Sequence, residues 1–197
     1  MSKTIVLILS LISLLPPQTS AGVIKGKIEC KGVKDNRDVI VYLEQTPDSA
    51  YASPKKNPVM DQKDLTFIPH VLPILKGTTV EFHNSDDVLH NVFTPDKCAE
   101  KMNLGTWPKN QSKSYTFENL GCESVILCNV HPEMEAWVVV LQNPFYAKTD
   151  KDGTFEIKDV PPGKYNLAVW HEKLKAPSVE IDVPATGAVE INFTLKK

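Results

Sequence analysis

Short runs rich in Val, Ile, Phe and Tyr recur along the chain, and Gly, Pro, Asp and Asn separate them. Clear examples are residues 22–28, 38–43 and 136–141. The segments 179–183 and 189–193 alternate apolar and polar residues, as half-buried strands do. The chain also contains 15 prolines, which disfavour long helices. We expect one helical turn, within residues 98–104, and otherwise an all-β protein built as sandwiches or barrels.

Two breaks in composition divide this series of strands. Residues 46–64 are rich in Pro, Lys, Ser and Asp, which is typical of a linker, and residues 142–144 indicate a second junction. The segment between them, residues 65–141, has a length that suits one small β-sandwich. The segments outside it, residues 22–45 and 146–197, carry further strand patterns.

Residues 1–21 have the pattern of a secretory signal peptide. Lys3 supplies a positive charge, residues 4–15 are apolar apart from two serines, and small residues precede an expected cleavage point near Ala21. The alternative is a membrane anchor, but the apolar run is shorter than the ~20 residues that a spanning helix needs. We therefore expect a mature chain without a membrane span, periplasmic or secreted, in an oxidising compartment.

Composition and charge narrow the function classes. The chain is 42% hydrophobic and 23% charged, which is typical of a globular protein. Its net charge is -2, and a charge so close to balance argues against nucleic acid as a partner.

A thiol, an imidazole and a thioether lie close together at residues 128–134, where the sequence reads C-N-V-H-P-E-M. A further imidazole is available at His90. One Cys, two His and one Met form the donor set of a type 1 copper site, with a His2Cys plane and a weak axial Met. Each residue alone also fits an ordinary role, as a buried thiol, a hydrogen-bonded imidazole or a core thioether. Together they predict one copper ion cycling between Cu(I) and Cu(II).

The donors lie within a longer set of motifs. A turn and strand at 76–82 (K-G-T-T-V-E-F) is followed by Asn84, by H-N-V at 90–92 and by the loop 128–134. In this order the motifs resemble the cupredoxins, the group of plastocyanin and amicyanin. The resemblance implies a Greek-key β-sandwich over residues 65–141.

The same resemblance assigns roles to single residues. It implies that His90, Cys128 and His131 bind copper, with Met134 as the axial ligand. It also implies that Asn91 braces the ligand loop, with backbone donation to the ligand sulfur. His131 would be the exposed electron port.

The outer segments resemble a second family. A glycine-bounded strand opens at 22–26, T-D-K-D-G-T-F follows at 149–155, and P-P-G-K-Y-N-L follows at 161–167. These motifs are similar to the carboxypeptidase regulatory-like, transthyretin-type sandwich. Residues 22–45 and 146–197 would then form one split sandwich, and the cupredoxin-like segment would be inserted into it or flanked by it.

The remaining cysteines are an odd number once Cys128 is assigned to copper. We expect a Cys98–Cys122 disulfide, because both residues fall in loops of the same segment and Cys30 precedes that segment. A disulfide that includes Cys30 is the alternative.

Two further histidines, His70 and His171, are candidates for an additional metal or redox role, against an ordinary structural one. The function expected first is a one-electron carrier between transient redox protein partners. The alternative is a copper-binding module for storage, delivery or sensing, and an interaction scaffold is a third reading. We do not expect an enzyme, because the chain has five His and no H-x-H pair, whereas multicopper catalysis uses additional His clusters.

Overall fold

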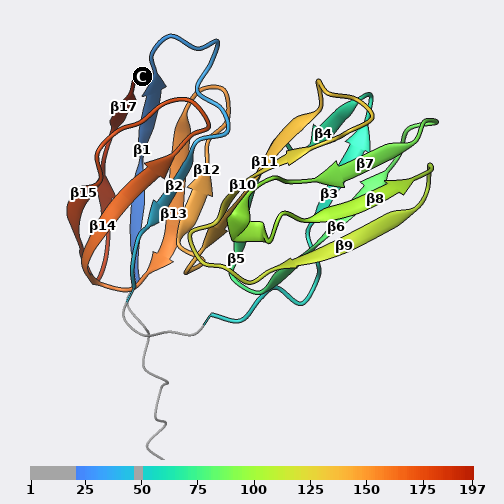
Figure 1. Cartoon of the computed structure of the whole chain (residues 1–197). Helices are drawn as coiled ribbons and strands as arrows, with labels where there is room; N and C mark the ends of the chain where they lie inside the picture. Colours follow the sequence, from blue (N-terminus) through green and yellow to red (C-terminus); the bar gives the residue numbers. More distant parts are fainter. Residues whose placement is uncertain (1–20, 47–50) are drawn as a thin grey trace, which may run out of the picture.

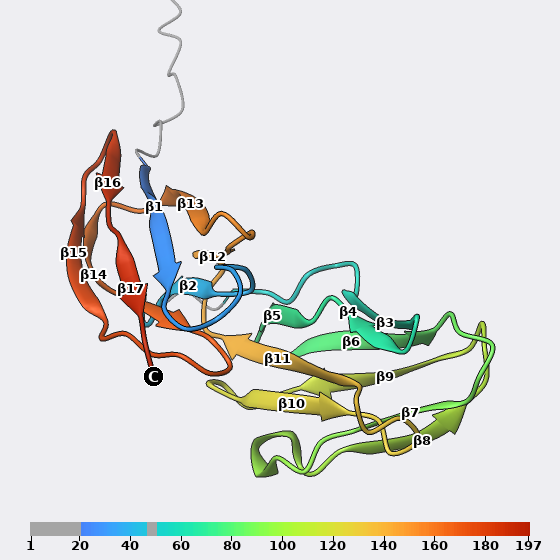
Figure 2. The ribbon, with the colours of Figure 1, turned by 90° about the horizontal axis from the view of Figure 1, so that it is seen from above.

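The computed structural model describes residues 21–46 and 51–197, so most of the expected signal peptide lies outside the described residues. Strands dominate, and they form two β-sandwiches that lie side by side (Figures 1 and 2). The all-β prediction is therefore confirmed. The expected helical turn is a short 3-10 turn, η1 (Lys97–Ala99), and the residues after it form a strand instead.

The flanking sandwich combines strands from both ends of the chain. Its strands are β1 (Gly22–Cys30), β2 (Ile40–Leu43), β12 (Tyr146–Lys148), β13 (Thr154–Val160), β14 (Gly163–Trp170), β15 (Val179–Val183), β16 (Ala188–Glu190) and β17 (Phe193–Leu195). In one sheet β1 pairs with β13, β16 and β17, and in the other β2 lies between β12 and β14. Both N-terminal strands thus share their sheets only with strands that follow residue 145.

Strand β1 shows why the sequence folds in this way. Its alternate residues Ile24 and Ile28 are fully buried in the core of the flanking sandwich, as the period of a strand requires. Gly26 lies between them, and a Cβ atom there would collide with the backbone carbonyl of Ile191. The glycine therefore permits the close approach of the segment between β16 and β17.

The central sandwich is continuous in sequence. Its strands are β3 (Val59–Lys63), β4 (Thr66–Ile68), β5 (Val71–Leu75), β6 (Thr78–Asn84), β7 (His90–Phe93), β8 (Asn103–Trp107), β9 (Ser112–Phe117), β10 (Glu123–Leu127) and β11 (Glu135–Leu141). One sheet has the order β5-β11-β10-β7-β8 and the other the order β4-β3-β6-β9. Large side chains such as Phe82, Trp107 and Ile126 fill the core between the sheets. Strands β7, β10 and β11 are neighbours, so the chain segments at their ends meet at one end of the sandwich.

The expected linker at 46–64 is too long, because residues 59–63 form β3. This strand pairs with β4 and β6. Its polar composition suggested a linker, but Met60 and Gln62 are both fully buried, and the Gln62 side chain donates a hydrogen bond to the His83 carbonyl. A glutamine is polar in the sequence and suggests exposure, but here it is buried and forms a hydrogen bond to the neighbouring strand β6.

A small apolar cluster joins the two sandwiches. Its buried members are Ile40, Val71, Val139, Leu141 and Trp170, contributed by β2 and β14 on one side and by β5 and β11 on the other. At the same junction the Lys148 ammonium donates to the Val71 carbonyl at 2.9 Å. The two sandwiches thus share buried side chains and a polar contact.

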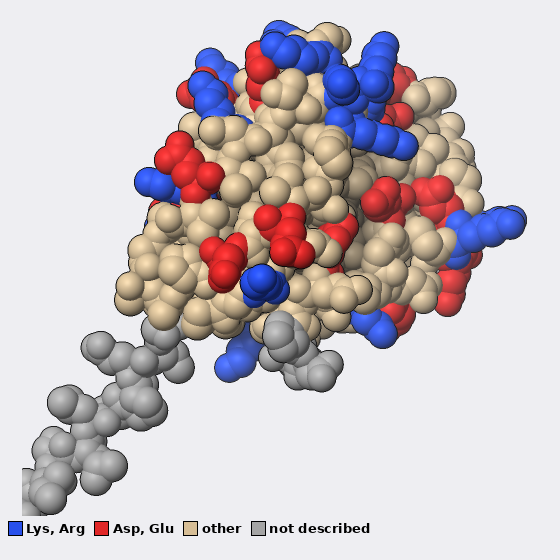
Figure 3. All heavy atoms as spheres, turned by 90° about the vertical axis from the view of Figure 1, so that its left-hand side faces the viewer, with Lys and Arg blue, Asp and Glu red and all other residues tan. Residues whose placement is uncertain are grey.

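The outer face of the flanking sandwich carries both signs of charge. Figure 3 shows Lys and Arg side chains gathered along its upper edge and Asp and Glu side chains across its middle. Within the described residues, no helix has the length and apolarity that crossing a membrane would require.

Candidate metal centre

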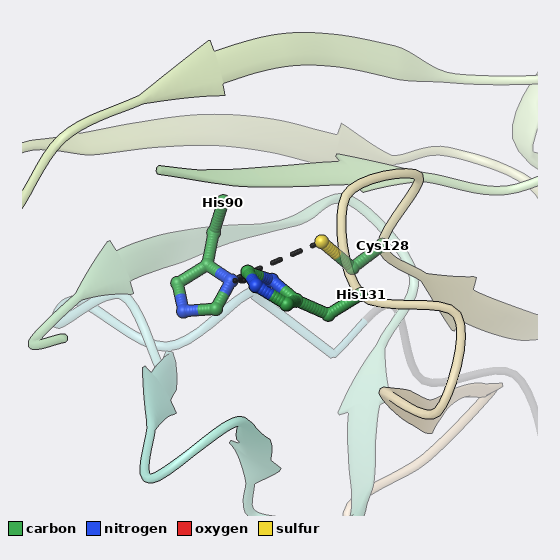
Figure 4. Close-up of side chains that lie close together, drawn as sticks. All are labelled: His90, Cys128 and His131. Atoms are coloured by element: carbon green, nitrogen blue, oxygen red, sulfur yellow. Dashed lines mark hydrogen bonds between the residues drawn. The ribbon is translucent and has the colours of Figure 1, made fainter. Parts of the chain in front are cut away.

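Three side chains converge at one end of the central sandwich. The ligand atoms of His90, Cys128 and His131 all lie within 4.8 Å of one another, and Figure 4 shows the three groups turned toward one point. The Nδ1 atom of His90 lies 3.9 Å from the Cys128 sulfur and 3.1 Å from Nδ1 of His131. His90 and Cys128 are buried, whereas His131 is half-buried. One thiol and two imidazoles at this spacing can hold a metal ion.

The strand order explains this convergence. His90 is the first residue of β7, Cys128 directly follows β10, and His131 lies in the loop before β11. Leu127 of β10 pairs with Phe93 of β7, which brings the end of one strand beside the other.

The loop before β7 is built around Asn84. Its side-chain amide donates to the carbonyls of Val88 and Trp107, at 2.9 and 3.0 Å, and its oxygen accepts the N–H of Asp86 at 2.9 Å. These three bonds fix the path of the chain from β6 to His90. The buried side-chain amide of Asn84 therefore determines the conformation of this loop.

Asp86 orients the His90 ring. Its Oδ2 atom lies 2.9 Å from Nε2 of His90, so that nitrogen carries the proton and Nδ1 presents its lone pair to the cluster. The Asp86 carboxylate also accepts the backbone N–H groups of Asp64 and Leu65. Burial alone would raise the pKa of Asp86, but the bonds from Leu65, His90 and Asp64 outweigh burial and lower the pKa. A carboxylate behind a histidine in this way is a frequent arrangement at metal sites.

Asn91 holds the other side of the cluster. Its backbone N–H points to the Cys128 sulfur at 3.4 Å, and its side-chain oxygen accepts the N–H of Asn129 at 3.2 Å. Its side-chain nitrogen donates to Asn103 and to the Gly105 carbonyl. One buried residue therefore ties β8 to the loop that carries the thiol.

Comparisons with known proteins agree with this architecture. Residues 133–196 match the carboxypeptidase regulatory-like domain family. A variant of amicyanin in its reduced Cu(I) form at pH 4 is 24% identical and aligns with 51% of this chain and 97% of its own, with a TM-score of 0.41. The match to the carboxypeptidase regulatory-like domain family covers nearly all of the outer segment 146–197, as the motifs in that segment indicated.

Two other solved structures are similar to the chain. A purple cupredoxin from Nitrosopumilus maritimus is 23% identical over 43% of this chain and 99% of its own, with a TM-score of 0.38. A Cu-containing nitrite reductase from Thermus scotoductus SA-01 is 26% identical over 50% of this chain and 25% of its own, with a TM-score of 0.42. No curated protein matches the chain.

Met134 lies at the end of the loop that follows Cys128 in the central sandwich. Its side chain is 1% exposed and belongs to the same buried cluster as Cys128. Its backbone N–H donates to the His131 carbonyl at 3.0 Å, which closes a turn between two of the expected ligands. This turn fixes where the loop enters β11.

The four cysteines divide as a pair and two thiols. Cys98 and Cys122 form a disulfide, with their Cα atoms 5.4 Å apart. Cys30 and Cys128 are free and buried. Cys30 lies in the core of the flanking sandwich, where burial raises the pKa of its thiol.

His70 and His171 do not join the three-residue cluster. His70 contacts Glu135 and Glu172 at the junction of the sandwiches. The Nδ1 atom of His171 accepts the backbone N–H groups of Lys173 and Leu174, so its proton sits on Nε2. Burial lowers the pKa of His171.

Two carboxylates that contact histidines were not predicted from the sequence. Asp86 lies beside His90, and Glu172 lies beside His70. Asp86 could have been found, because it precedes His90 by four residues in a short D-D-V-L-H segment. Glu172 carries no comparable signal, since its contacts with His70 and Trp137 come from residues far away in the chain.

Proposed function

We propose that the protein is an extracytoplasmic mononuclear type 1 copper protein that carries single electrons between redox partners. The observation that supports this most is the convergence of one thiol and two imidazole Nδ1 atoms, with the sulfur held by a backbone N–H. Thiolate and imidazole suit copper in both of its common oxidation states.

In this proposal His90, Cys128 and His131 would hold the copper ion, and Met134 would be a further, weaker donor. Bound copper would supply a one-electron Cu(I)/Cu(II) couple. Asp86 holds the His90 ring, and the Asn91 side chain holds the loop, so the donors stay in place when the charge changes. Rigid donors lower the reorganisation that accompanies electron transfer.

His131 is the proposed electron port. It is the half-buried member of the cluster, and its neighbour Val130 is 44% exposed. Leu89, next to the other histidine, is 53% exposed. Exposed apolar side chains beside a redox group suit a small and transient contact with a partner protein.

We also propose that the central sandwich is inserted into the flanking one. The pairing of β1 with β13 and of β2 with β14 supports this organisation. Limited proteolysis within residues 51–58 and 142–145 should leave the fragments before and after the central sandwich bound to each other. Their separation without denaturant would contradict the insertion.

The extracytoplasmic location rests on the leader pattern and on the Cys98–Cys122 disulfide, which is typical of oxidising compartments. Sequencing the N-terminus of the protein purified from its own host would test it. A mature chain that begins near Gly22 supports the proposal, and an intact Met1 contradicts it.

The decisive experiment loads the protein with Cu(II) and compares it with Cys128→Ser. We expect one copper per chain, an intense thiolate-to-copper absorption band and narrow copper hyperfine splitting, with the band and the narrow splitting lost in the variant. Cys30→Ser is the matched control, because Cys30 is the other buried free thiol and lies in the flanking core. One copper with an ordinary tetragonal spectrum would favour copper storage, delivery or sensing instead.

A further inference from the structure

A single carboxylate of the flanking sandwich contacts the central sandwich twice. Oε2 of Glu172, in the loop after β14, lies 3.0 Å from Nε2 of His70 and accepts the indole N–H of Trp137 at 3.1 Å. Its other oxygen accepts from Lys173 at 2.8 Å. The Glu172 side chain is only 14% exposed, so these bonds are partly shielded from water.

His70 extends this contact to the ligand loop. Its Nδ1 atom lies 3.0 Å from the Glu135 carbonyl oxygen, which can only accept, so Nδ1 donates. Its Nε2 atom lies 3.0 Å from the Glu172 carboxylate, so the ring links Glu172 to the backbone of Glu135. Glu135 directly follows Met134 in sequence. The bridge from Glu172 through His70 therefore ends one residue from the proposed axial ligand.

Two further contacts make this junction stiff. The Trp137 backbone N–H donates to the His70 carbonyl at 2.8 Å, so β11 holds His70 from both its main chain and its side chain. The rings of Trp137 and Trp170 lie 5.6 Å apart at 59° across the two sandwiches. A shift of Glu172 would therefore be transmitted to the start of β11 rather than absorbed by a loose contact.

We propose that Glu172 is a positioning residue of the copper site: through His70 it fixes the start of β11 and thereby the approach of Met134 to the metal. The inference rests on the function proposed above. The axial Met bond of a type 1 site is long and weak, so the protein, and not the metal, sets its length. The flanking sandwich would then tune the copper site rather than only accompany it.

A bridge that only joins the two sandwiches predicts a different result. The His70 side chain is 40% exposed, and ion pairs so open to solvent contribute little to stability. A structural role would therefore change unfolding slightly and leave the metal site as it was. A positioning role changes the potential and the axial coordination.

The first test is Glu172→Gln in the full protein, with Glu180→Gln as control. Glu180 is an exposed glutamate of β15 in the same sandwich, so the control makes the same chemical change away from the bridge. In Glu172→Gln we expect the thiolate band to persist, the reduction potential to shift and copper affinity to fall by about tenfold. In the control all three should match the unmodified protein.

A second variant removes the contact between His70 and Glu172 but keeps the contact between residue 70 and the Glu135 carbonyl. In His70→Asn the shorter amide can still donate to the Glu135 carbonyl but cannot reach Glu172. The inference expects the same shift as in Glu172→Gln, and expects the double variant to shift no further than either single variant. If Glu172→Gln does not fold, His70→Asn alone carries the test.

A measurement on the metal-free protein tests the positioning role of Glu172 independently of the proposed copper function. The Met134 amide, bonded to the His131 carbonyl, should exchange its hydrogen faster in both bridge variants than in the metal-free unmodified protein. Absence of a thiolate band in the unmodified protein would overturn the proposed function, and the exchange rates would still decide the bridge. An unchanged potential, copper affinity and Met134 exchange rate in the folded variants would overturn the positioning role.

Discussion

The Nε2 atom of His90 lies 2.9 Å from the Oδ2 atom of Asp86, and the imidazole is fully buried. The carboxylate is itself held by the N–H groups of Asp64 and Leu65, so its position does not depend on the histidine. One consequence is that Nδ1 of His90 faces the cluster, 3.9 Å from the Cys128 sulfur.

Replacing Asp86 by Asn should weaken the site. The amide nitrogen would replace either Oδ1, which accepts from Asp64, or Oδ2, which accepts from Leu65 and His90, so at least one of the three present bonds must be lost. We expect copper affinity to fall about 10- to 100-fold, measured by competition with a chelator of known affinity. Asp87→Asn is the control, because Asp87 is the exposed neighbour and pairs with Lys109. Equal affinity in both variants would show that the carboxylate does not orient the ring.

Asn91 should contribute to stability even without metal. Truncation to Ala would remove partners from the Gly105 carbonyl and from the Asn129 N–H, and both bonds are partly buried. We expect the free energy of unfolding of the metal-free protein to fall by about 1–3 kcal/mol, measured by denaturant titration.

A suitable control for this variant is Asn166→Ala, because Asn166 is exposed on β14 of the flanking sandwich. Equal losses in the two variants would contradict a special role for the Asn91 side chain.

The convergence of His90, Cys128 and His131 could be predicted in part from sequence, because Cys128 and His131 fall within one short loop and are therefore close in space. The strands were predictable for a similar reason, since alternation in β1 and β6 reflects burial directly. Strand β3 was missed because its buried Gln62 is polar. Composition cannot separate a buried amide, such as the Gln62 side chain that donates to the His83 carbonyl, from a solvated one.

The bridge at Glu172 could not be predicted from sequence. It depends on how two sandwiches dock, and residues 70, 137 and 172 come from three separate parts of the chain. No periodic pattern links such positions, because the contact is set by the packing of Trp170 and its apolar neighbours and not by any single strand.

The Cys98–Cys122 disulfide should add measurable stability. The two residues are separated by 24 positions, and closing a loop of that length restricts the unfolded chain. Replacing both by Ala should lower the free energy of unfolding of the metal-free protein by about 3 kcal/mol. Peptide mapping without reduction should recover this pair with Cys30 and Cys128 as thiols, and a Cys30-containing disulfide would contradict the arrangement.

The contribution of Glu172 to stability should depend on pH. Burial alone would raise the pKa of this carboxyl, but hydrogen bonds from Lys173 and His70 outweigh burial and hold the pKa below its ordinary value. A folded-state pKa below the unfolded one means that the charged group stabilises the fold above an unfolded pKa of about 4.3, and that this stability is lost as the pH falls through the folded pKa. Glu172→Gln should therefore cost about 1 kcal/mol at about pH 6 and less at about pH 3. Denaturant unfolding of the metal-free protein measures this difference, with Glu180→Gln as the exposed control. A cost for Glu172→Gln that stays constant between the two pH values would mean that the carboxylate charge does not act through His70 and Lys173.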